Sequence, residues 1–223
     1  MSDIVKRLLL IKSEIKDLFV NNKIIKSEPN IIAVCKTFSM DKILPLIDIG
    51  HIHFGENKVQ EAISKWLVVK KKHSNVNLHM GGKLQTNKVK LALQIFDYIH
   101  SLDNKKLAEK ISKYEVELKK KTPLFIQVNL GNESQKSGIN LEELSQFINY
   151  CKKDLSLNII GLMCLPPLNK DPKIFFLKLN DIAKKNNLPH LSMGMTSDYL
   201  EAIRCGSTFL RIGSKIFGER KNN

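Results

Sequence analysis

Short apolar runs alternate with amphipathic segments along most of this chain. From residue 30 onward, each run of apolar or β-branched residues is followed by a segment with helical spacing. The predicted strands cover residues 30–36, 51–56, 76–81, 98–102, 124–130, 158–165, 190–194 and 208–213. The predicted helices cover residues 3–20, 40–49, 57–72, 85–95, 104–121, 141–153, 171–187 and 197–205, with a last turn after residue 214.

Strands that alternate with helices predict a parallel sheet built from right-handed crossovers. Eight such strands favour a closed (β/α)₈ TIM barrel, preceded by an extra N-terminal helix. The alternative is an open doubly wound sheet, which usually has fewer strands and a glycine-rich first turn. No G-x-G-x-x-G motif follows residues 30–36, and no linker interrupts the pattern. We therefore expect residues 1–223 to form a single barrel domain.

The composition is that of an ordinary folded protein, with 43% hydrophobic and 26% charged residues. No apolar stretch is long enough to cross a bilayer, and residues 1–7 do not resemble the start of a signal peptide. We expect a cytoplasmic protein without a membrane partner. The four cysteines form no C-x-x-C pair, which predicts buried, reduced thiols at Cys35, Cys151, Cys164 and Cys205.

The formal charge of +14 raises the possibility of nucleic-acid binding. Arginine, the residue best suited to phosphates and base edges, occurs only four times in the chain. The lysines are spread along the sequence, and the densest group, residues 70–72, is typical of a solvated helix end. We interpret the charge as a lysine-rich bias and expect no nucleic-acid partner.

Chemically useful residues follow the predicted strands, and in a barrel those strand ends meet at one mouth. Lys36 ends the first strand. Gly194 ends the seventh strand and is followed by Thr196 and Ser197, and Gly213 ends the eighth strand and is followed by Ser214. Glycine lets the backbone approach a ligand, and such loops commonly hold a phosphate in this fold. The alternative for each loop is ordinary helix capping by Ser or Thr.

A lysine facing a phosphate site suggests Schiff-base chemistry, because burial would lower the pKa of its amine and favour attack on an aldehyde. Two ligand classes fit: a sugar-phosphate carbonyl, as in an aldolase, or pyridoxal 5′-phosphate (PLP). Arg211 favours PLP. Its permanent charge beside a pyridine nitrogen would keep that nitrogen unprotonated.

Motifs along nearly the whole chain resemble the pyridoxal phosphate homeostasis protein family of the YggS/PROSC type, whose barrel is similar to the N-terminal domain of alanine racemase. The matching segments are AVCKT (33–37), FGEN (54–57), LQTNK (84–88), KSG (136–138), GLM (161–163), LSMGM (191–195) and RIGSKIFG (211–218). They occur in the family's order. Two positions depart from the family pattern: Gly81 stands where an aliphatic residue is usual, and Thr196 stands where serine is usual.

The resemblance implies that Lys36 carries PLP as a Schiff base and that Arg211 faces the pyridine nitrogen. It also implies that four residues lie at or near the phosphate and that one lies at the rim of the pocket. The four phosphate residues are Ser192, Thr196, Gly213 and Ser214, and the rim residue is Asn57.

The resemblance implies a role in intracellular PLP homeostasis, in which the protein stores PLP and makes it available to other enzymes. Possible partners are PLP-dependent apo-enzymes, and we expect a monomer. Because the sequence ends soon after the last predicted strand, we expect no second domain to supply an opposing acid–base group, and therefore little or no catalysis. The alternative is a PLP-dependent amino-acid racemase of low activity.

Two further hypotheses arise from the second predicted strand. His51 and His53 share one face of it and could bind a metal, although a third ligand at suitable spacing is missing from the pattern. We expect no metal. Glu56, at the strand's end, could act as a general acid or serve a structural role at the start of the next helix.

Overall fold

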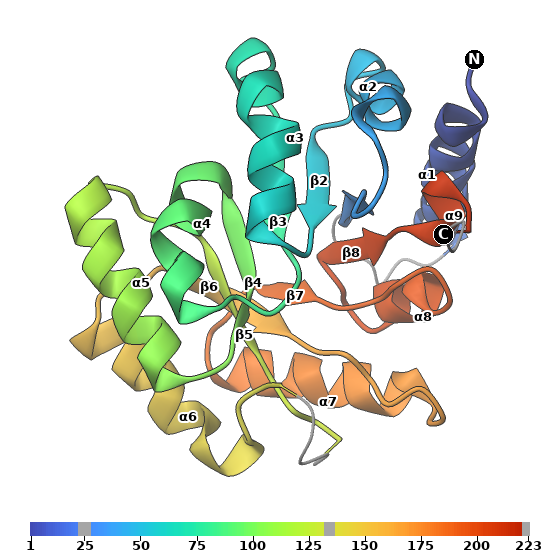
Figure 1. Ribbon diagram of the computed structural model, residues 1–223. Coiled ribbons are helices and arrows are strands. Elements are labelled where there is room, and N and C mark those ends of the chain that lie inside the picture. The colour runs from blue at the N-terminus through green and yellow to red at the C-terminus, as the bar shows by residue number, and fades with distance from the viewer. Residues whose placement is uncertain (22–27, 132–136, 220–223) are drawn as a thin grey trace.

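The computed structural model describes residues 1–21, 28–131 and 137–219, and its centre is a closed barrel of parallel strands (Figure 1). Neighbouring strands pair in chain order, and β8 pairs with β1 to close the ring. This confirms the predicted barrel and excludes the open sheet. The strands are β1 (Asn30–Val34), β2 (His53–Glu56), β3 (Asn77–Met80), β4 (Tyr98–Leu102), β5 (Leu124–Gln127), β6 (Ile159–Met163), β7 (His190–Ser192) and β8 (Phe209–Ile212).

Helices surround the barrel, as Figure 1 shows. They are α1 (Asp3–Asn21), α2 (Met40–Asp48), α3 (Val59–Lys72), α4 (Val89–Ile95), α5 (Lys105–Leu118), α6 (Leu141–Asn149), α7 (Pro172–Lys185), α8 (Tyr199–Arg204) and α9 (Ser214–Phe217). Two predicted helices are divided. A 3₁₀ turn (Thr86–Lys88) precedes α4, and a π-helical turn (Tyr150–Asp154) extends α6.

Apolar side chains pack in two layers. The larger layer lies between the strands and the helices, where Phe54 of β2 packs against Trp66 of α3 and both are fully buried. A smaller cluster is formed by alternate residues of the strands, including Ile32, Phe125 and Phe209. Filling the interior in this way makes the barrel a packed core rather than a pore.

The N-terminal helix packs beside the last helix of the barrel, next to α9 in Figure 1. Leu8 and Ile11 of α1 are fully buried. Lys215 of α9 donates to the Glu14 carboxylate at 2.7 Å and to the Tyr199 hydroxyl at 2.6 Å. The extra helix is thus tied to the turn that follows β8.

Within the described part of the chain, no helix combines the length and apolar character needed to span a membrane. All four cysteines are buried and free, as the sequence predicted. Burial raises the pKa of the Cys164 thiol to about 12, which keeps it protonated and unreactive.

Candidate functional site

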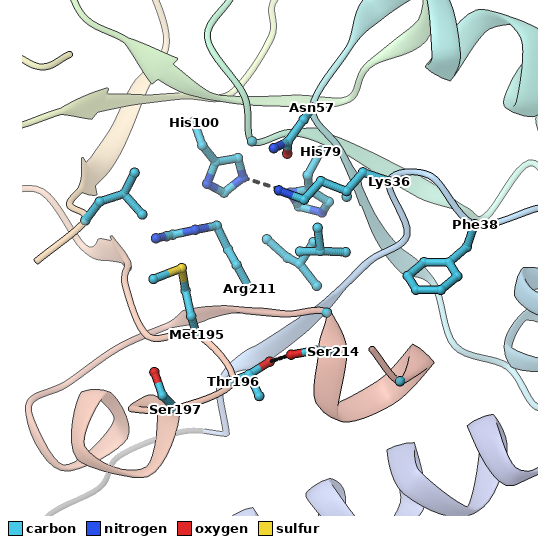
Figure 2. Close-up of a pocket in the computed structure, with 17 residues that line it drawn as sticks. Lys36, Phe38, Asn57, His79, His100, Met195, Thr196, Ser197, Arg211 and Ser214 are labelled. Atoms are coloured by element: carbon cyan, nitrogen blue, oxygen red, sulfur yellow. Dashed lines mark hydrogen bonds between the residues drawn. The ribbon is translucent and has the colours of Figure 1, made fainter. Parts of the chain in front are cut away.

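A cavity of about 500 Å³ opens at the carboxyl ends of the strands, and we call it the mouth pocket. Its size is typical of a small-molecule site. Figure 2 shows Thr196, Ser197 and Ser214 along one side, and Lys36, Asn57, His79 and His100 along the other, with Arg211 between them. These side chains come from different strands, so the pocket exists only because the barrel is closed.

Lys36 lies two residues beyond the end of β1 and is half-buried in the pocket wall. The preceding residue keeps the strand's pairing, because the Cys35 amide donates to the Gly55 carbonyl at 2.9 Å. Thr37 then has a φ of 69°. A positive φ is unfavourable for a β-branched residue, so the chain turns sharply here at a cost in energy. The turn ends the strand at the point where the lysine enters the pocket.

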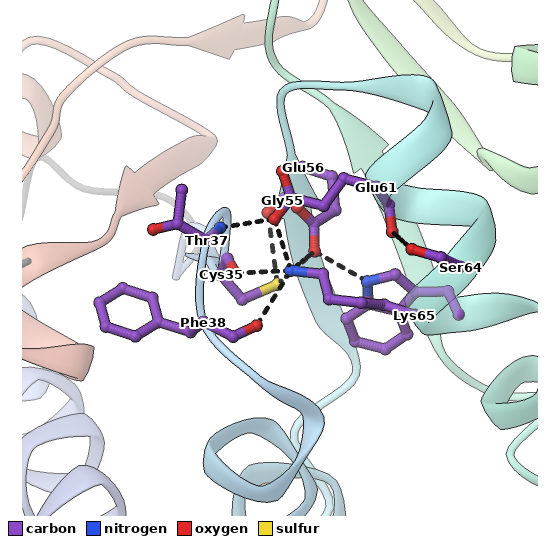
Figure 3. A network of polar contacts seen from close by, with 9 residues as sticks. Cys35, Thr37, Phe38, Gly55, Glu56, Glu61, Ser64 and Lys65 are labelled. Atoms are coloured by element: carbon purple, nitrogen blue, oxygen red, sulfur yellow. Dashed lines mark hydrogen bonds and ion pairs between the residues drawn. The ribbon is translucent and has the colours of Figure 1, made fainter. Parts of the chain in front are cut away.

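Lys65 of α3 holds this turn from behind, as Figure 3 shows. Its ammonium donates to the carbonyls of Cys35 at 2.9 Å and Phe38 at 3.1 Å. It also contacts Glu61 at 2.9 Å, and Glu61 accepts the Thr37 amide at 2.5 Å. Lys65 therefore fixes the backbone on both sides of Lys36. It also positions Glu61, which holds the strained Thr37.

Glu56, the last residue of β2, is fully buried and is not among the residues that line the pocket. It contacts Lys65 at 2.6 Å and accepts the Trp66 indole N–H at 2.9 Å. Burial raises the pKa of its carboxyl group above the usual value, against the opposing effect of the two donors. These contacts support the structural alternative for Glu56 rather than a general acid.

Arg211 forms the base of the pocket and is only 8% exposed. One guanidinium nitrogen, Nη1, donates to the carbonyl and the hydroxyl of Ser192, both at 2.7 Å. The other, Nη2, donates to the Cys164 carbonyl at 3.0 Å. Burial lowers its pKa from the usual value, but an arginine so held remains a cation at neutral pH. Among the described residues no carboxylate forms an ion pair with it.

The opposite side of the pocket is built from the loops after β7 and β8. Thr196 and Ser214 bring their hydroxyls within 3.3 Å of each other. Gly194 has a φ of +89°, and an added Cβ would lie 2.6 Å from the Cβ of Ala202, so only glycine fits this turn. At Gly213 an added Cβ would lie 3.3 Å from the Val34 carbonyl, because β1 passes close by. Gly213 thus lets its loop approach the strand that leads to Lys36, whereas Gly194 lets its loop pack closely against α8.

Six of the seven predicted site residues line the mouth pocket: Lys36, Asn57, Thr196, Arg211, Gly213 and Ser214. Ser192 does not. Its side chain is fully buried and its hydroxyl accepts a hydrogen bond from Arg211 Nη1 at 2.7 Å, so its place at or near a phosphate stays a prediction. Lys136, part of one matching motif, lies outside the described residues.

The departure at Gly81 leaves strand pairing intact. Its amide donates to the Glu56 carbonyl at 2.9 Å, and an added Cβ would make ordinary contact with the Asn57 side-chain oxygen at 3.5 Å. The glycine lines the pocket beside Asn57 and leaves room there, so the end of β3 is not loosened.

Sequence reasoning missed His79 and His100, which both line the pocket. Each lies inside a predicted strand, so the alternation of side chains along the strand was the signal that could have shown which face it occupies.

The hypothesis of a metal site concerned His51 and His53. The His53 ring bonds to the His79 ring, whereas the His51 ring bonds to the His53 carbonyl. Among residues 1–21, 28–131 and 137–219, no three His, Cys, Asp or Glu side chains are grouped to hold a metal ion.

The sequence of this chain is similar to those of known proteins. Residues 19–221 match the family described as alanine racemase, N-terminal domain. The pyridoxal phosphate homeostasis protein of Aquifex aeolicus is 36% identical over 200 residues, covering 86% of this chain and 87% of the relative. The Escherichia coli K12 protein of the same name is 31% identical over 233 residues, covering 99% and 98%.

Solved structures agree. PipY of Synechococcus elongatus without PLP superposes with a TM-score of 0.87 at 31% identity, covering 97% of this chain and all of that one. The same protein with PLP bound gives 0.84 at 30% identity, with the same coverage. An alanine racemase of Clostridium difficile gives 0.71 at 12% identity, covering 99% of this chain and 57% of that one, which shows the shared fold alone.

The contacts of Lys65 predict a large difference between single and double substitutions. Lys65→Met should destabilise the protein by about 3 kcal/mol or more, because it leaves the buried Glu56 carboxylate without its cation. Adding Glu56→Gln should recover part of that loss, since the amide keeps an acceptor for Trp66 and carries no charge. Urea unfolding followed by circular dichroism measures both.

The matched control is Lys90→Met, which removes an exposed lysine paired with Glu117 and should change stability little. If Lys65→Met and Glu56→Gln destabilise additively, the two side chains do not depend on each other, and the interpretation of the buried pair is wrong.

Proposed function

This chain belongs to the pyridoxal phosphate homeostasis protein family, and we propose that its mouth pocket holds PLP as a Schiff base on Lys36 and makes it available to other enzymes within the cell. One observation carries the proposal. A lysine and a buried arginine share one pocket with a pair of facing hydroxyls, on the barrel seen with PLP in PipY. In this proposal the lysine reacts with the aldehyde of PLP, and the arginine faces its pyridine nitrogen. The two hydroxyls bind its phosphate.

The charges of the pocket fit such a ligand. Its described lining includes the cations Lys36 and Arg211 and no Asp or Glu. A phosphate group brings negative charge, which two cations in a partly buried pocket stabilise. The volume of about 500 Å³ leaves space for a substituted pyridine ring with its phosphate.

Each residue has a distinct task in this proposal. The Lys36 amine condenses with the aldehyde, so that a carbon–nitrogen double bond forms and one water molecule leaves. Arg211 presents a permanent cation to the ring nitrogen and so keeps that nitrogen unprotonated, which makes the ring a weak electron acceptor. The hydroxyls of Thr196 and Ser214 donate hydrogen bonds to the phosphate oxygens, and Gly213 lets the backbone come close to the phosphate. Asn57 closes the rim.

The same geometry supports storage over catalysis. Racemisation needs a second acid–base group across the substrate from the lysine. None of the four tyrosines, all within the described residues, lines the pocket. The His79 ring uses both nitrogens in bonds to other histidines, and His100 uses both in bonds to His79 and Ser192. PLP-dependent apo-enzymes are accordingly the proposed partners, and a monomeric state stays a prediction.

Labelling the lysine tests the central claim. Borohydride reduction of the protein with added PLP should leave a phosphopyridoxyl group on the peptide that contains Lys36, and Lys36→Gln should lose the visible absorbance of the bound cofactor. Lys58→Gln is the control, because that lysine is exposed and does not line the pocket. A wild-type protein that takes up no added PLP would sink the proposal.

The facing hydroxyls predict selectivity for the phosphate. Thr196→Val should weaken PLP binding by about tenfold, the value of one hydrogen bond to a charged group, and should leave the binding of phosphate-free pyridoxal unchanged. Fluorescence titration with both ligands measures the ratio. Equal weakening of both ligands would show that Thr196 does not contact the phosphate.

Storage predicts delivery without turnover. Holo-protein should reactivate a PLP-dependent apo-enzyme faster than PLP is released to a small-molecule trap. In deuterated water, the α-hydrogen of added alanine should exchange no faster than with free PLP. Reactivation no faster than release would contradict direct delivery, and rapid exchange would favour the racemase alternative.

A further inference from the structure

Four side chains from separate strands are hydrogen-bonded in a row through the barrel interior and end at Arg211. Ser192 Oγ lies 2.8 Å from His100 Nδ1. His100 Nε2 lies 2.9 Å from His79 Nδ1, and His79 Nε2 lies 2.9 Å from His53 Nδ1. We call this row the histidine chain. It leads from the base of the mouth pocket toward the opposite end of the barrel.

The donor–acceptor direction along the histidine chain follows from the contact between Ser192 and Arg211 at its end. Arginine can only donate, so Nη1 of Arg211 gives a hydrogen to Ser192 Oγ at 2.7 Å. The hydroxyl hydrogen of Ser192 then has one acceptor among its contacts, His100 Nδ1. His100 must therefore carry its hydrogen on Nε2 and donate to His79, and His79 must do the same toward His53. In the reverse direction the fully buried Ser192 hydroxyl hydrogen would have no acceptor, which is costly.

The surroundings keep these rings neutral and fixed. Burial lowers the pKa of His79 and His100 well below the usual value, and the charge of Arg211 lowers that of His100 further. A neutral ring donates at one nitrogen and accepts at the other, as the chain requires. His79 stacks on Tyr98 at 4.4 Å, and His100 stacks on Phe125 at 4.3 Å, which fixes both ring planes.

We propose that His100, with His79 and His53 behind it, positions Arg211 by holding the Ser192 hydroxyl in the orientation that accepts from the guanidinium. Arg211 is buried and has no ion-paired carboxylate among the described residues. Its Nη1 depends on the oxygens of Ser192, and the hydroxyl oxygen faces Arg211 with a lone pair only while its hydrogen points to His100. The consequence for PLP affinity rests on the proposed function; the orientation of Arg211 does not.

The first test needs no ligand. Two-bond ¹H–¹⁵N correlation spectra at neutral pH should show His53, His79 and His100 protonated on Nε2 and unprotonated on Nδ1. A hydrogen on Nδ1 of any of the three, or a charged ring, would overturn the proposal.

The second test uses a pair of variants at one position. His100→Phe keeps the stacking on Phe125 but removes the acceptor, so the Arg211 Nη hydrogens should exchange with water at least about tenfold faster than in the wild type. His100→Asn returns an acceptor near the place of Nδ1 and should restore most of the protection. His190→Phe is the control, because His190 also packs against Phe209 but lies outside the histidine chain.

The same variants connect the chain to the pocket. His100→Phe should raise the dissociation constant for PLP by about tenfold, with partial recovery in His100→Asn and none of this change in His190→Phe. If His100→Phe fails to fold, Ser192→Ala removes the hydroxyl that links His100 to Arg211 and should give the same two effects. Unchanged Arg211 exchange in a folded variant would overturn the positioning role. If the wild type binds no PLP, the proposed function fails while the exchange result still decides this inference.

Discussion

The pairing of β8 with β1 is the constraint on which the rest of the site depends. In that register Arg211 lies opposite Ile32, and Ile212 lies opposite Ala33. Because every strand is parallel, the residues after β1 and β8 emerge side by side at one end of the barrel. Lys36 and Arg211 are 175 positions apart by their numbers, yet closure of the ring gives them a common pocket.

Two cations near β1, the partly buried Lys65 and the buried Arg211, are stabilised in opposite ways. Lys65 of α3 contacts the carboxylates of Glu56 and Glu61, which neutralise its charge locally. Arg211, on the pocket side, contacts carbonyls and a hydroxyl, which solvate the guanidinium without cancelling its charge. The first arrangement holds the backbone around Lys36, whereas the second leaves positive potential in the cavity. An anionic ligand gains from the second and does not perturb the first.

Much of the fold was predictable because the sequence pattern is strong. All eight strands were found within a few residues, and β4 was placed at its observed bounds, since apolar runs flanked by helical segments have few other interpretations. The predicted first strand ran on to residue 36, whereas β1 ends at Val34, because the turn at Thr37 depends on Glu61 and Lys65 of another element. Pattern alone does not contain that contact.

Only part of the candidate site was predictable from the sequence. Lys36 and Arg211 are revealed by position at strand ends and by motif resemblance. The histidine chain is not, because strand alternation says which face a residue occupies but not which neighbours it meets. His100 and Ser192 are separated by 92 positions and become partners only through the stagger of the strands around the ring. The same stagger brings the Ser192 hydroxyl into contact with both His100 and Arg211.

The strained turn at Thr37 has a consequence for how this sequence can evolve. Its amide is held by Glu61, 24 positions away, while its own φ of 69° would suit glycine or asparagine better. A relaxing substitution at residue 37 makes the turn depend less on the acid, although Glu61 still pairs with Lys65, whereas loss of the acid first leaves the strain uncompensated. Mutations at the two positions are therefore acceptable in one order and harmful in the other, which makes the pair an epistatic unit that should covary among homologues.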